Sequence, residues 1–413
     1  MNLQIDSDRL SREIEELAAI SEAPPPVVTR VVFSEADLRA REFVRRLCTE
    51  AGLSIRCDAV GNTFARWNGA EKDLAPVATG SHIDAIPNAG RFDGTVGVLG
   101  GLEAIRSLKR AGFRPRRGIE LIVFTAEEPT RFGIGCLGSR LIAGVLSESA
   151  GERLRDRDGA TLDEVRHNAG FSGPLNTVRL FSGVYAGFIE LHIEQGPMLE
   201  QNKVDIGIVT AIAAPATLDI LIEGEGGHAG AVLMPQRRDA FLAAAEIALA
   251  VEAAALSTGA ADTVGTVGIC EVFPGAVNSI PSRARVTVDV RDIDGPRRDS
   301  VLRFLDLTIS EIEKRRSVAI RKELVNADDP VDCDPRMVHA IARACATQGI
   351  RFERMISRAY HDSLFMARVA PTAMIFIPCR GGVSHRPDEF ASPEAMAQGS
   401  LVLAEALVSL ASE

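Results

Sequence analysis

Apolar residues along the chain fall into two patterns, short continuous runs and longer stretches in which they recur every three or four positions. The continuous runs predict strands buried on both faces, at 75–78, 119–124, 186–193 and 372–378. The longer stretches predict amphipathic helices, at 2–21, 34–50, 94–110 and from about 393 onward. Because the two kinds of element alternate, we expect an α/β fold with a mostly parallel sheet covered by helices on both faces.

Turn and capping residues mark where several elements begin or end. Ser34-Glu35-Ala36-Asp37 resembles a capping box, and the helix that it starts is expected to run to about Glu50. Gly61-Asn62 is expected to form the turn of a hairpin near the only tryptophan, Trp67. Residues 151–185 are charged and contain Gly, Ser and Asn clusters, so we expect helix and loop over the surface there.

The pattern changes at about residue 210. A half-exposed strand, an alanine-rich helix, two strands, another helix and a last strand follow one another, at 217–223, 236–256, 263–272, 284–292, 296–314 and 317–325. From Asp334 the earlier pattern of helices and apolar strands returns. This order predicts an α+β domain at 211–327, inserted into a larger domain formed by 1–210 and 328–413.

Composition and charge narrow the class of protein. The 413 residues are 46% hydrophobic, and the net charge of −10 argues against a nucleic-acid or anionic-membrane surface. The N-terminal stretch is acidic, unlike a signal peptide, and no apolar run reaches the ~20 residues that cross a bilayer. Seven scattered cysteines without a Cys-x-x-Cys spacing favour buried free thiols over a disulfide framework, so we expect a cytoplasmic protein.

Several imidazole and carboxylate side chains follow the apolar, strand-like runs. These side chains are His82, Asp93, Glu127, Glu128, His192 and His385. Open α/β sheets bind ligands at the carboxyl ends of their strands, so these groups could line one edge of a single sheet. Imidazole and carboxylate together suit zinc, manganese or a related divalent ion, and a two-metal site needs a shared ligand.

One arrangement accounts for all of these residues. Asp93 would bridge two ions, and His82 and His192 would join one of them. Glu128 and His385 would join the other, which leaves the adjacent glutamate free to act as a base. A plainer interpretation exists, because strand-end histidines are commonly satisfied core residues and glutamate pairs commonly form solvated turns. Spacing alone leaves both interpretations open.

Other patterns carry weaker signals. Gly224-x-Gly226-x-x-Ala229 superficially fits a dinucleotide fingerprint, but no helix opens directly on it. Ser363 and Ser384 each lie near a histidine, but no Gly-x-Ser-x-Gly elbow supports a serine hydrolase. We interpret two further histidines in polar, helix-like surroundings as structural, His167 and His339.

The motifs taken together resemble the amidase/hydantoinase/carbamoylase branch of the M20 metallopeptidase-like family. The matching segments are Gly80-Ser81-His82-Ile83-Asp84, Gly90-Arg91-Phe92-Asp93-Gly94, Glu127-Glu128, Arg131-Phe132-Gly133, Leu137-Gly138-Ser139-Arg140, residues 190–197, Asn278-Ser279-Ile280-Pro281 and Ser384-His385. They cover most of the chain in order.

The resemblance implies a two-metal catalytic domain, with manganese favoured and zinc possible, and an inserted lid domain that forms a homodimer. It implies five metal ligands, His82, Asp93, Glu128, His192 and His385. It also implies that Glu127 is the general base, and that His228, on a glycine-rich loop of the partner subunit's lid, contacts the substrate and stabilises the oxyanion.

Two segments, 127–132 and 227–235, depart from the commoner pattern of the branch. Together with 357–363 they resemble the members that hydrolyse ureidoglycolate, which implies cleavage of its ureido C–N bond with release of ammonia and carbon dioxide in purine catabolism. Hydrolysis of N-carbamoyl-L-amino acids or of allantoate is the alternative. A non-catalytic ureide-binding protein is a further hypothesis, against which the presence of all six positions argues. The N-terminal targeting extension of the plant members is not expected here, which suggests a bacterial cytoplasmic relative.

Further side chains are candidates for binding a small ureido carboxylate. Arg291 offers a planar cation for the carboxylate, with an ion pair to Asp289 or Asp292 as the alternative. Asn278 and Gln195 are candidate partners of the ureido group.

Two other residues near the motifs are given weaker roles. His361 could contact the substrate as well. We interpret Asp84 as a carboxylate that orients His82 rather than as a sixth ligand.

Overall fold

The computed structural model describes residues 3–413, which form two compact units. Unit 1 contains the chain up to Thr210 together with Cys333–Ser357 and His361–Glu413, and unit 2 contains Ala211–Asp332 and Arg358–Tyr360. Residues 328–332 and 358–360, which we had placed in the larger domain, therefore belong to unit 2. The N-terminal helix expected over 2–21 is α1 (Ser7–Ala18), and Asn2 lies outside the described residues.

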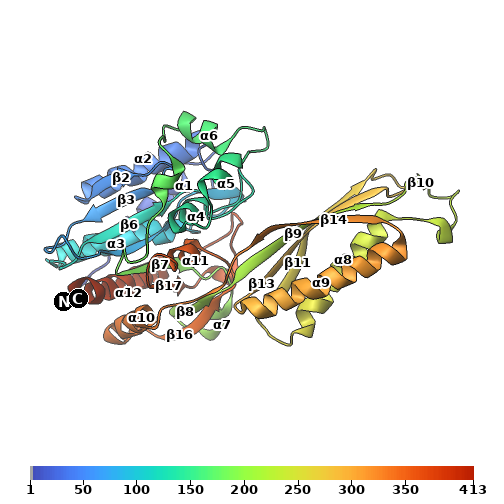
Figure 1. The fold of residues 1–413 in the computed structure, drawn as a ribbon. Coiled ribbons are helices and arrows are strands. Elements are labelled where there is room, and N and C mark those ends of the chain that lie inside the picture. Colours follow the sequence, from blue (N-terminus) through green and yellow to red (C-terminus); the bar gives the residue numbers. More distant parts are fainter. Residues whose placement is uncertain (1–2) are drawn as a thin grey trace. The chain divides into compact units, whose positions relative to one another are not determined.

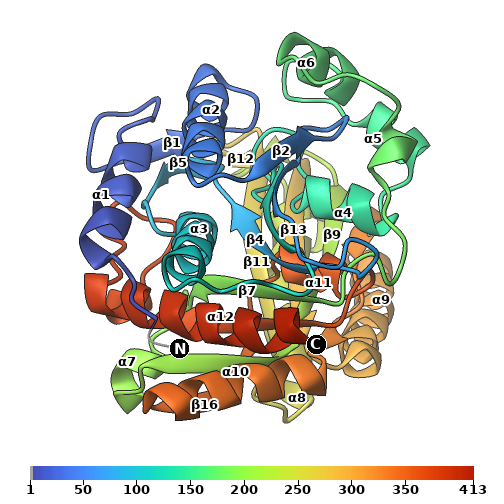
Figure 2. The ribbon, with the colours of Figure 1, turned by 90° about the vertical axis from the view of Figure 1, so that its left-hand side faces the viewer.

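Unit 1 is built around one sheet (Figures 1 and 2). The strands of this sheet are β2 (Ser54–Cys57), β3 (Thr63–Trp67), β4 (Val77–His82), β6 (Ile119–Phe124), β7 (Gly187–Ile193), β8 (Ile206–Ile212), β15 (Val331–Asp332), β16 (Phe352–Ser357) and β17 (Thr372–Ile377). Of these, β15 and the last two residues of β8 belong to unit 2. The spatial order is β15-β8-β17-β7-β4-β6-β3-β2, with β16 paired to β8. A separate ribbon joins β1 (Val28–Arg30) to β5 (Ala85–Ala89).

The sheet is mixed, so the expectation of a mostly parallel sheet applies only to its centre. The strands β17, β7, β4 and β6 run parallel. On the outside, β8 pairs antiparallel with β17, and β3 pairs antiparallel with β6 and β2. The β2–β3 pair is the hairpin expected from Gly61-Asn62, and Gly61 takes a φ of +92° in its turn.

Helices cover both faces of this sheet. Besides α1, the helices of unit 1 are α2 (Glu35–Glu50), α3 (Thr95–Arg110), α4 (Leu137–Ala143), α5 (Glu148–Arg153), α6 (Leu162–Asn168), α7 (Met198–Asn202), α10 (Pro335–Gln348), α11 (Asp362–Met366) and α12 (Pro393–Ser412). Successive residues of β6 point to opposite faces. Leu121 faces Gly101 of α3, whereas Ile122 packs in a cluster with Leu137 and Leu141 of α4.

Residues 151–185 contribute to the core rather than only covering the surface. Leu162, Val165, Phe171, Leu175 and Val178 are buried in the same cluster as β6 and α4. Their spacing within a charged segment concealed this role, because single apolar residues separated by turns produce no helical or strand period.

Unit 2 is a four-stranded antiparallel sheet, in the order β11-β13-β9-β14, with two helices packed on it. Its elements are β9 (Ala214–Glu223), β10 (Gly227–His228), α8 (Ala240–Ser257), β11 (Val264–Phe273), β12 (Ser279–Ile280), β13 (Arg283–Asp292), α9 (Gly295–Arg316) and β14 (Ala319–Ala327). The two ends of the unit meet, because Val331 of β15 pairs with Ile212 of β8. The α+β architecture expected for the inserted segment is thus present.

Among residues 3–413, two helices, α8 and α12, are long and apolar enough to cross a membrane by length and composition alone. Helix α12 is mostly buried inside unit 1. Helix α8 buries Ala243, Ile247 and Val251 in the core of unit 2, and its Glu246 pairs with Arg315 and Arg316 of α9. Both are accounted for as helices that pack in a protein core.

All seven cysteines are free thiols. Five are buried, at positions 48, 136, 333, 345 and 379, as expected from the sequence. Cys57 and Cys270 are exposed, so the expectation of burial is wrong for these two, which lie on the strands β2 and β11 at the edges of their sheets.

Candidate metal site

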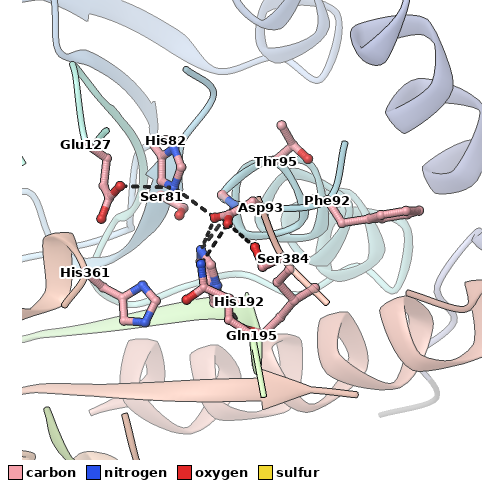
Figure 3. A network of polar contacts seen from close by, with 12 residues as sticks. Ser81, His82, Phe92, Asp93, Thr95, Glu127, His192, Gln195, His361 and Ser384 are labelled. Carbon is pink, nitrogen blue, oxygen red and sulfur yellow. Dashed lines mark hydrogen bonds and ion pairs between the residues drawn. The ribbon is translucent and has the colours of Figure 1, made fainter. Parts of the chain in front are cut away.

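Four neighbouring parallel strands bring the candidate ligands to one edge of the sheet in unit 1, and Figure 3 shows three of these ligands, His82, Asp93 and His192. Strand β4 ends at His82, and His192 is the penultimate residue of β7. The pair Glu127-Glu128 follows the end of β6, and His385 lies in the loop after β17. Because the four strands are parallel, their carboxyl ends meet at a single edge.

Asp93 stands at the centre of this cluster. Its Oδ1 lies 3.5 Å from Nε2 of His82 and 3.2 Å from Nε2 of His192. Its Oδ2 lies 3.4 Å from Nε2 of His385, which in turn lies 3.3 Å from Oε1 of Glu128. Each group of three offers donor atoms within 4.8 Å of one another. The two oxygens of Asp93 therefore face two separate groups, which is the grouping expected from the sequence for a bridging ligand.

Two glycines allow the backbone to place Asp93 there. Gly94 takes a φ of +65°, and a Cβ at this position would lie 2.4 Å from Nε2 of His82. Its N–H donates to Nε2 of His192 at 3.1 Å, a contact that a metal on that nitrogen would replace. A Cβ on Gly90 would lie 2.4 Å from the Cβ of Glu389. Larger residues would push Asp93 away from the strand ends.

Hydrogen bonds to two rings decide which of their nitrogens face Asp93. Nδ1 of His82 lies 3.1 Å from the carbonyl oxygen of Asp84, and Nδ1 of His192 lies 2.9 Å from that of Ile193. A carbonyl can only accept, so each Nδ1 carries a proton, and in the neutral ring each Nε2 keeps a lone pair on the side of Asp93. A lone pair that faces a carboxylate repels it unless a proton or a metal ion lies between them. The donor set therefore fits a divalent metal.

The carboxylates of the cluster favour a positive charge on the histidine rings. Hydrogen bonds with Asp93 and Glu128 raise the pKa of His385 to about 11. Burial lowers the pKa of His82, but nearby carboxylates, of which Glu127 is the strongest, raise it overall to well above its usual value. A divalent ion would compete with these protons, so metal binding should release them.

Glu127 lies beside the two groups rather than within either. Its Oε2 is 3.7 Å from Nε2 of His82, and its side chain is almost fully buried. Burial raises the pKa of Glu127 well above its usual value. Ala126, the preceding residue, takes a φ of +55° in the turn that carries the two glutamates. The position and the proton affinity of Glu127 suit a group that accepts a proton.

Asp84 has a different contact from the one expected. Its backbone carbonyl, and not its carboxylate, accepts the hydrogen bond from His82, because the carboxylate lies 3.7 Å from the ring nitrogen. The carboxylate instead accepts the N–H groups of Glu127 at 3.2 Å and of Glu128 at 3.1 Å. The backbone of Asp84 therefore holds His82, and its carboxylate holds the turn that carries Glu127 and Glu128.

Three side chains hold Asp93 in place through hydrogen bonds to its carboxylate or its backbone. Gln195 and Ser384 donate to its Oδ2 at 2.7 and 2.6 Å, and Gln195 takes a φ of +55° to do so. Glu389 accepts the N–H groups of Phe92 and Asp93 at 2.7 and 3.1 Å. Glu389 was missed in the sequence, where its only signal is its position four residues after His385. Gln195 contacts Asp93 in the structure, and its role toward a ureido group stays a prediction.

His361 lies behind the ligand cluster. Its ring centroid is 4.5 Å from that of His192, and its Nε2 lies 3.1 Å from the hydroxyl of Ser357. The side chain is buried. His361 thus packs against a candidate ligand, and a contact with substrate stays a prediction.

Unit 2 brings His228 and Asn278 together. Gly227-His228 pairs with Ser279-Ile280, and the N–H of Ala229 donates to the carbonyl of Asn278 at 2.9 Å. Both side chains are exposed. Nδ1 of His228 accepts the N–H of Gly230 at 3.1 Å, so in the neutral ring the proton lies on Nε2.

Arg291 lies at the opposite end of unit 2 from His228. It is the penultimate residue of β13, whereas Asn278 precedes the first residue of that strand, and ten residues of strand span roughly 30 Å. Its guanidinium pairs with Asp289 at 2.7 Å and lies 5.6 Å from the ring of Tyr360. The ion pair with Asp289 is the alternative left open above, so binding of a substrate carboxylate by Arg291 stays a prediction.

Comparisons with known proteins agree with this architecture. A family model described as peptidase family M20/M25/M40 matches residues 78–409. The chain is 53% identical to a ureidoglycolate hydrolase of Oryza sativa subsp. japonica, over 98% of this chain and 85% of the relative. It is 38% identical to an N-carbamoyl-L-amino acid amidohydrolase of Geobacillus stearothermophilus, over 97% of both chains.

A solved structure is similar to this chain over its whole length. The crystal structure of AtUAH in complex with glyoxylate superposes with a TM-score of 0.93 at 51% identity, over 100% of this chain and 99% of the other. The same protein has been solved in complex with (S)-hydroxyglycine. Both of those ligands are small carboxylates.

Proposed function

Because the chain belongs to peptidase family M20/M25/M40, we propose that it is a metal-dependent amidohydrolase that cleaves the ureido C–N bond of ureidoglycolate. The observation that carries the substrate is the identity of 53% to a ureidoglycolate hydrolase over almost the whole chain. Release of ammonia and carbon dioxide would place the reaction in the breakdown of purine-derived ureides. The buried carboxylate and histidine cluster supplies the chemistry that this class of hydrolase needs.

Hydrolysis of N-carbamoyl-L-amino acids or of allantoate fits less well, because the relatives with those names are 32–38% identical. The test is ammonia release from ureidoglycolate, allantoate and a panel of N-carbamoyl amino acids, with manganese supplied. We expect kcat/KM to be highest for ureidoglycolate. A clear preference for an N-carbamoyl amino acid would overturn the substrate and leave the class of enzyme intact.

We propose that the site holds two divalent ions, with Mn²⁺ favoured and Zn²⁺ possible. His82, His192 and one oxygen of Asp93 would hold one ion, and Glu128, His385 and the other oxygen would hold the second. When bound, such ions lower the pKa of water from about 15.7 toward 7 and polarise the carbonyl. The nitrogen and oxygen donors suit both metals, so metal analysis of the purified protein decides between them.

Glu127 is the residue that moves the proton in this proposal. Its carboxylate takes a proton from the attacking water and gives it to the departing nitrogen, so one group serves as base and then as acid. Its raised pKa suits both steps, because the group holds a proton firmly enough to deliver it. Glu127→Gln should abolish turnover while the bound metal stays at the wild-type level. Wild-type activity in that variant would refute the assignment.

His228 is proposed to stabilise the oxyanion. The hydrogen bond from Gly230 to its Nδ1 leaves Nε2 as a donor, which is the tautomer that an oxyanion requires. Asn278, which lies beside it in unit 2, is proposed to bind the ureido group. Arg291 is proposed to bind the substrate carboxylate after exchanging its partner Asp289.

The separation within unit 2 supports a homodimer. Because the His228–Asn278 end and Arg291 lie roughly 30 Å apart along the sheet, one copy of unit 2 would not present both ends to a single small substrate. We propose that each substrate receives Arg291 from one subunit and His228 of the partner subunit. Size-exclusion chromatography with light scattering tests the oligomeric state.

The surface of unit 2 suits such an interface. Several large apolar side chains are exposed on its helices and on its two edge strands, Leu249, Leu256, Phe304, Leu307, Ile269, Phe273, Leu324 and Val325. Exposed apolar patches and unpaired strand edges are typical of surfaces that another chain covers. Seven free thiols suit a reducing compartment, and we propose a cytoplasmic location on that ground.

A further inference from the structure

The proposed base is in contact with a buried cysteine. The sulfur of Cys136 lies 3.5 Å from Oε1 of Glu127, and Cys136 has no exposed surface. An ionised carboxylate can only accept hydrogen bonds, so the thiol is the donor. Burial, followed by the charge of Glu127, raises the pKa of this thiol well above its usual value, which keeps the proton on sulfur.

The backbone fixes the sulfur relative to the carboxylate. The N–H of Cys136 donates to the carbonyl of Glu127 at 2.7 Å. The next two N–H groups, of Leu137 and Gly138, donate to the carbonyls of Ala126 and Thr125 at 2.8 Å each. The segment that begins at Cys136 is therefore paired with the turn that carries the base, so neither can shift without the other.

Cys136 also has a backbone conformation that side chains rarely adopt. Its φ and ψ are 54° and 35°, in the left-handed region where glycine fits without a steric penalty. A glycine would satisfy the backbone, yet a thiol stands here and its polar contact is with Glu127. The backbone conformation alone therefore does not call for a cysteine at this position.

We propose that Cys136 is a positioning residue for Glu127, because its thiol binds Oε1 and keeps Oε2 turned toward the metal-ligand cluster. Oε2 lies 3.7 Å from Nε2 of His82, on the side where the proton is transferred. This inference rests on the proposed role of Glu127 as general base. A thiol is a weak donor, so it can fix the orientation of the carboxylate without withdrawing much of its basicity.

Other ionisable groups face Glu127 from the neighbouring elements. They are His82 at the end of β4, Asp93 before α3, Glu128 in the same turn and Asp362 at the start of α11. Substitution of Cys136 changes none of these groups. A difference in the pH profile among variants at this one position therefore reports the contact between sulfur and carboxylate.

The test compares Cys136→Gly, Cys136→Ala and Cys136→Ser with Cys345→Ala, a buried cysteine on α10, as the control. Loss of the donor in the Gly and Ala variants should lower kcat by about 3- to 10-fold at unchanged KM, as expected for a weak hydrogen bond. It should also move the acidic limb of the kcat profile to higher pH, because the ionised carboxylate is less stabilised. The Ser variant, with a stronger donor, should regain part of kcat and move the limb to lower pH.

Melting temperature and metal content separate positioning from folding. Cys136→Gly removes the backbone strain, so we expect it to melt no lower than the Ala variant and to keep its metal. Wild-type kcat and an unmoved acidic limb in the Gly and Ala variants would overturn the inference. A loss of kcat with an unmoved limb that serine does not restore would overturn it as well. An active Glu127→Gln variant would refute the proposed base instead, so the two failures are distinguishable.

Discussion

Gly94 offers a direct test of how closely the candidate ligands are packed. Its φ is +65°, and a Cβ added there would lie 2.4 Å from Nε2 and 2.5 Å from Cδ2 and Cε1 of the His82 ring. Carbon and nitrogen in ordinary contact are about 3.5 Å apart, so His82 or the start of α3 would have to move by about 1 Å. A displacement of about 1 Å in a catalytic constellation can cost about 100-fold in rate. We therefore expect Gly94→Ala to lose about 100-fold in kcat/KM and to bind metal weakly.

Gly112 provides a matched control at the other end of the same helix. Its φ is +71°, and nothing lies within 4 Å of a Cβ added there. Gly112→Ala should therefore incur only the left-handed backbone cost of about 1–2 kcal/mol. Gly94→Ala should incur at least that cost, because its φ of 65° and ψ of −43° lie outside the left-handed helical region, together with about 1–3 kcal/mol of overpacking. Urea denaturation, metal titration and ammonia release measure the three effects, and equal behaviour of the two variants in all three assays would refute the argument.

Three further predictions follow from contacts described above. Asp84→Asn leaves one of the N–H groups of Glu127 and Glu128 facing another donor, so kcat at saturating metal should fall by about 10- to 100-fold, and an unchanged kcat would contradict this. Arg291→Ala should raise KM for ureidoglycolate by about 10- to 100-fold with little change in kcat, whereas an unchanged KM would exclude Arg291 from carboxylate binding. Burial raises the pKa of Asp58 to about 6 from 3.8, so the folded protein binds the proton more tightly and stability falls as the pH rises. Relative to Asp58→Asn, the wild-type protein should be about 1.4 kcal/mol more stable at pH 5 than at pH 8 in urea denaturation, and an equal difference at both pH values would refute the assignment.

Apolar periodicity and strand-end chemistry were sufficient to predict much of unit 1. The strongly apolar run 119–124 is β6 to the residue, and the Ser34 cap is confirmed as the start of α2. The proximity of His82, Asp93 and His192 could also be expected, because parallel strands end at one edge of a sheet. Their roles as ligands stay a prediction, to be tested by metal analysis.

Other features could not be predicted, for physical reasons. Buried strands show the same apolar run whether their neighbours are parallel or antiparallel, so the mixed sheet was not foreseeable. Glu389 acts through N–H groups almost 300 positions away, and Cys136 through a positive φ, neither of which leaves a period in the sequence. For Arg291 the sequence named Asp289 and Asp292 as possible partners, and only the structure shows that the pair forms with Asp289.

The pairing of Ile212 with Val331 has a consequence for how this chain folds. Candidate ligands lie at positions 82 and 385, so the whole of unit 2 intervenes between the first and the last of them. Closing a flexible loop of that length costs entropy, but a unit whose two ends are adjacent strands acts as a short connection once it has folded. Unit 2 can thus form early and shorten the search by which the last parallel strand, β17, finds β7. Once folded, unit 2 therefore adds little to the entropic cost of pairing β17 with β7. Because His385 follows β17, metal affinity would report that this final strand has docked.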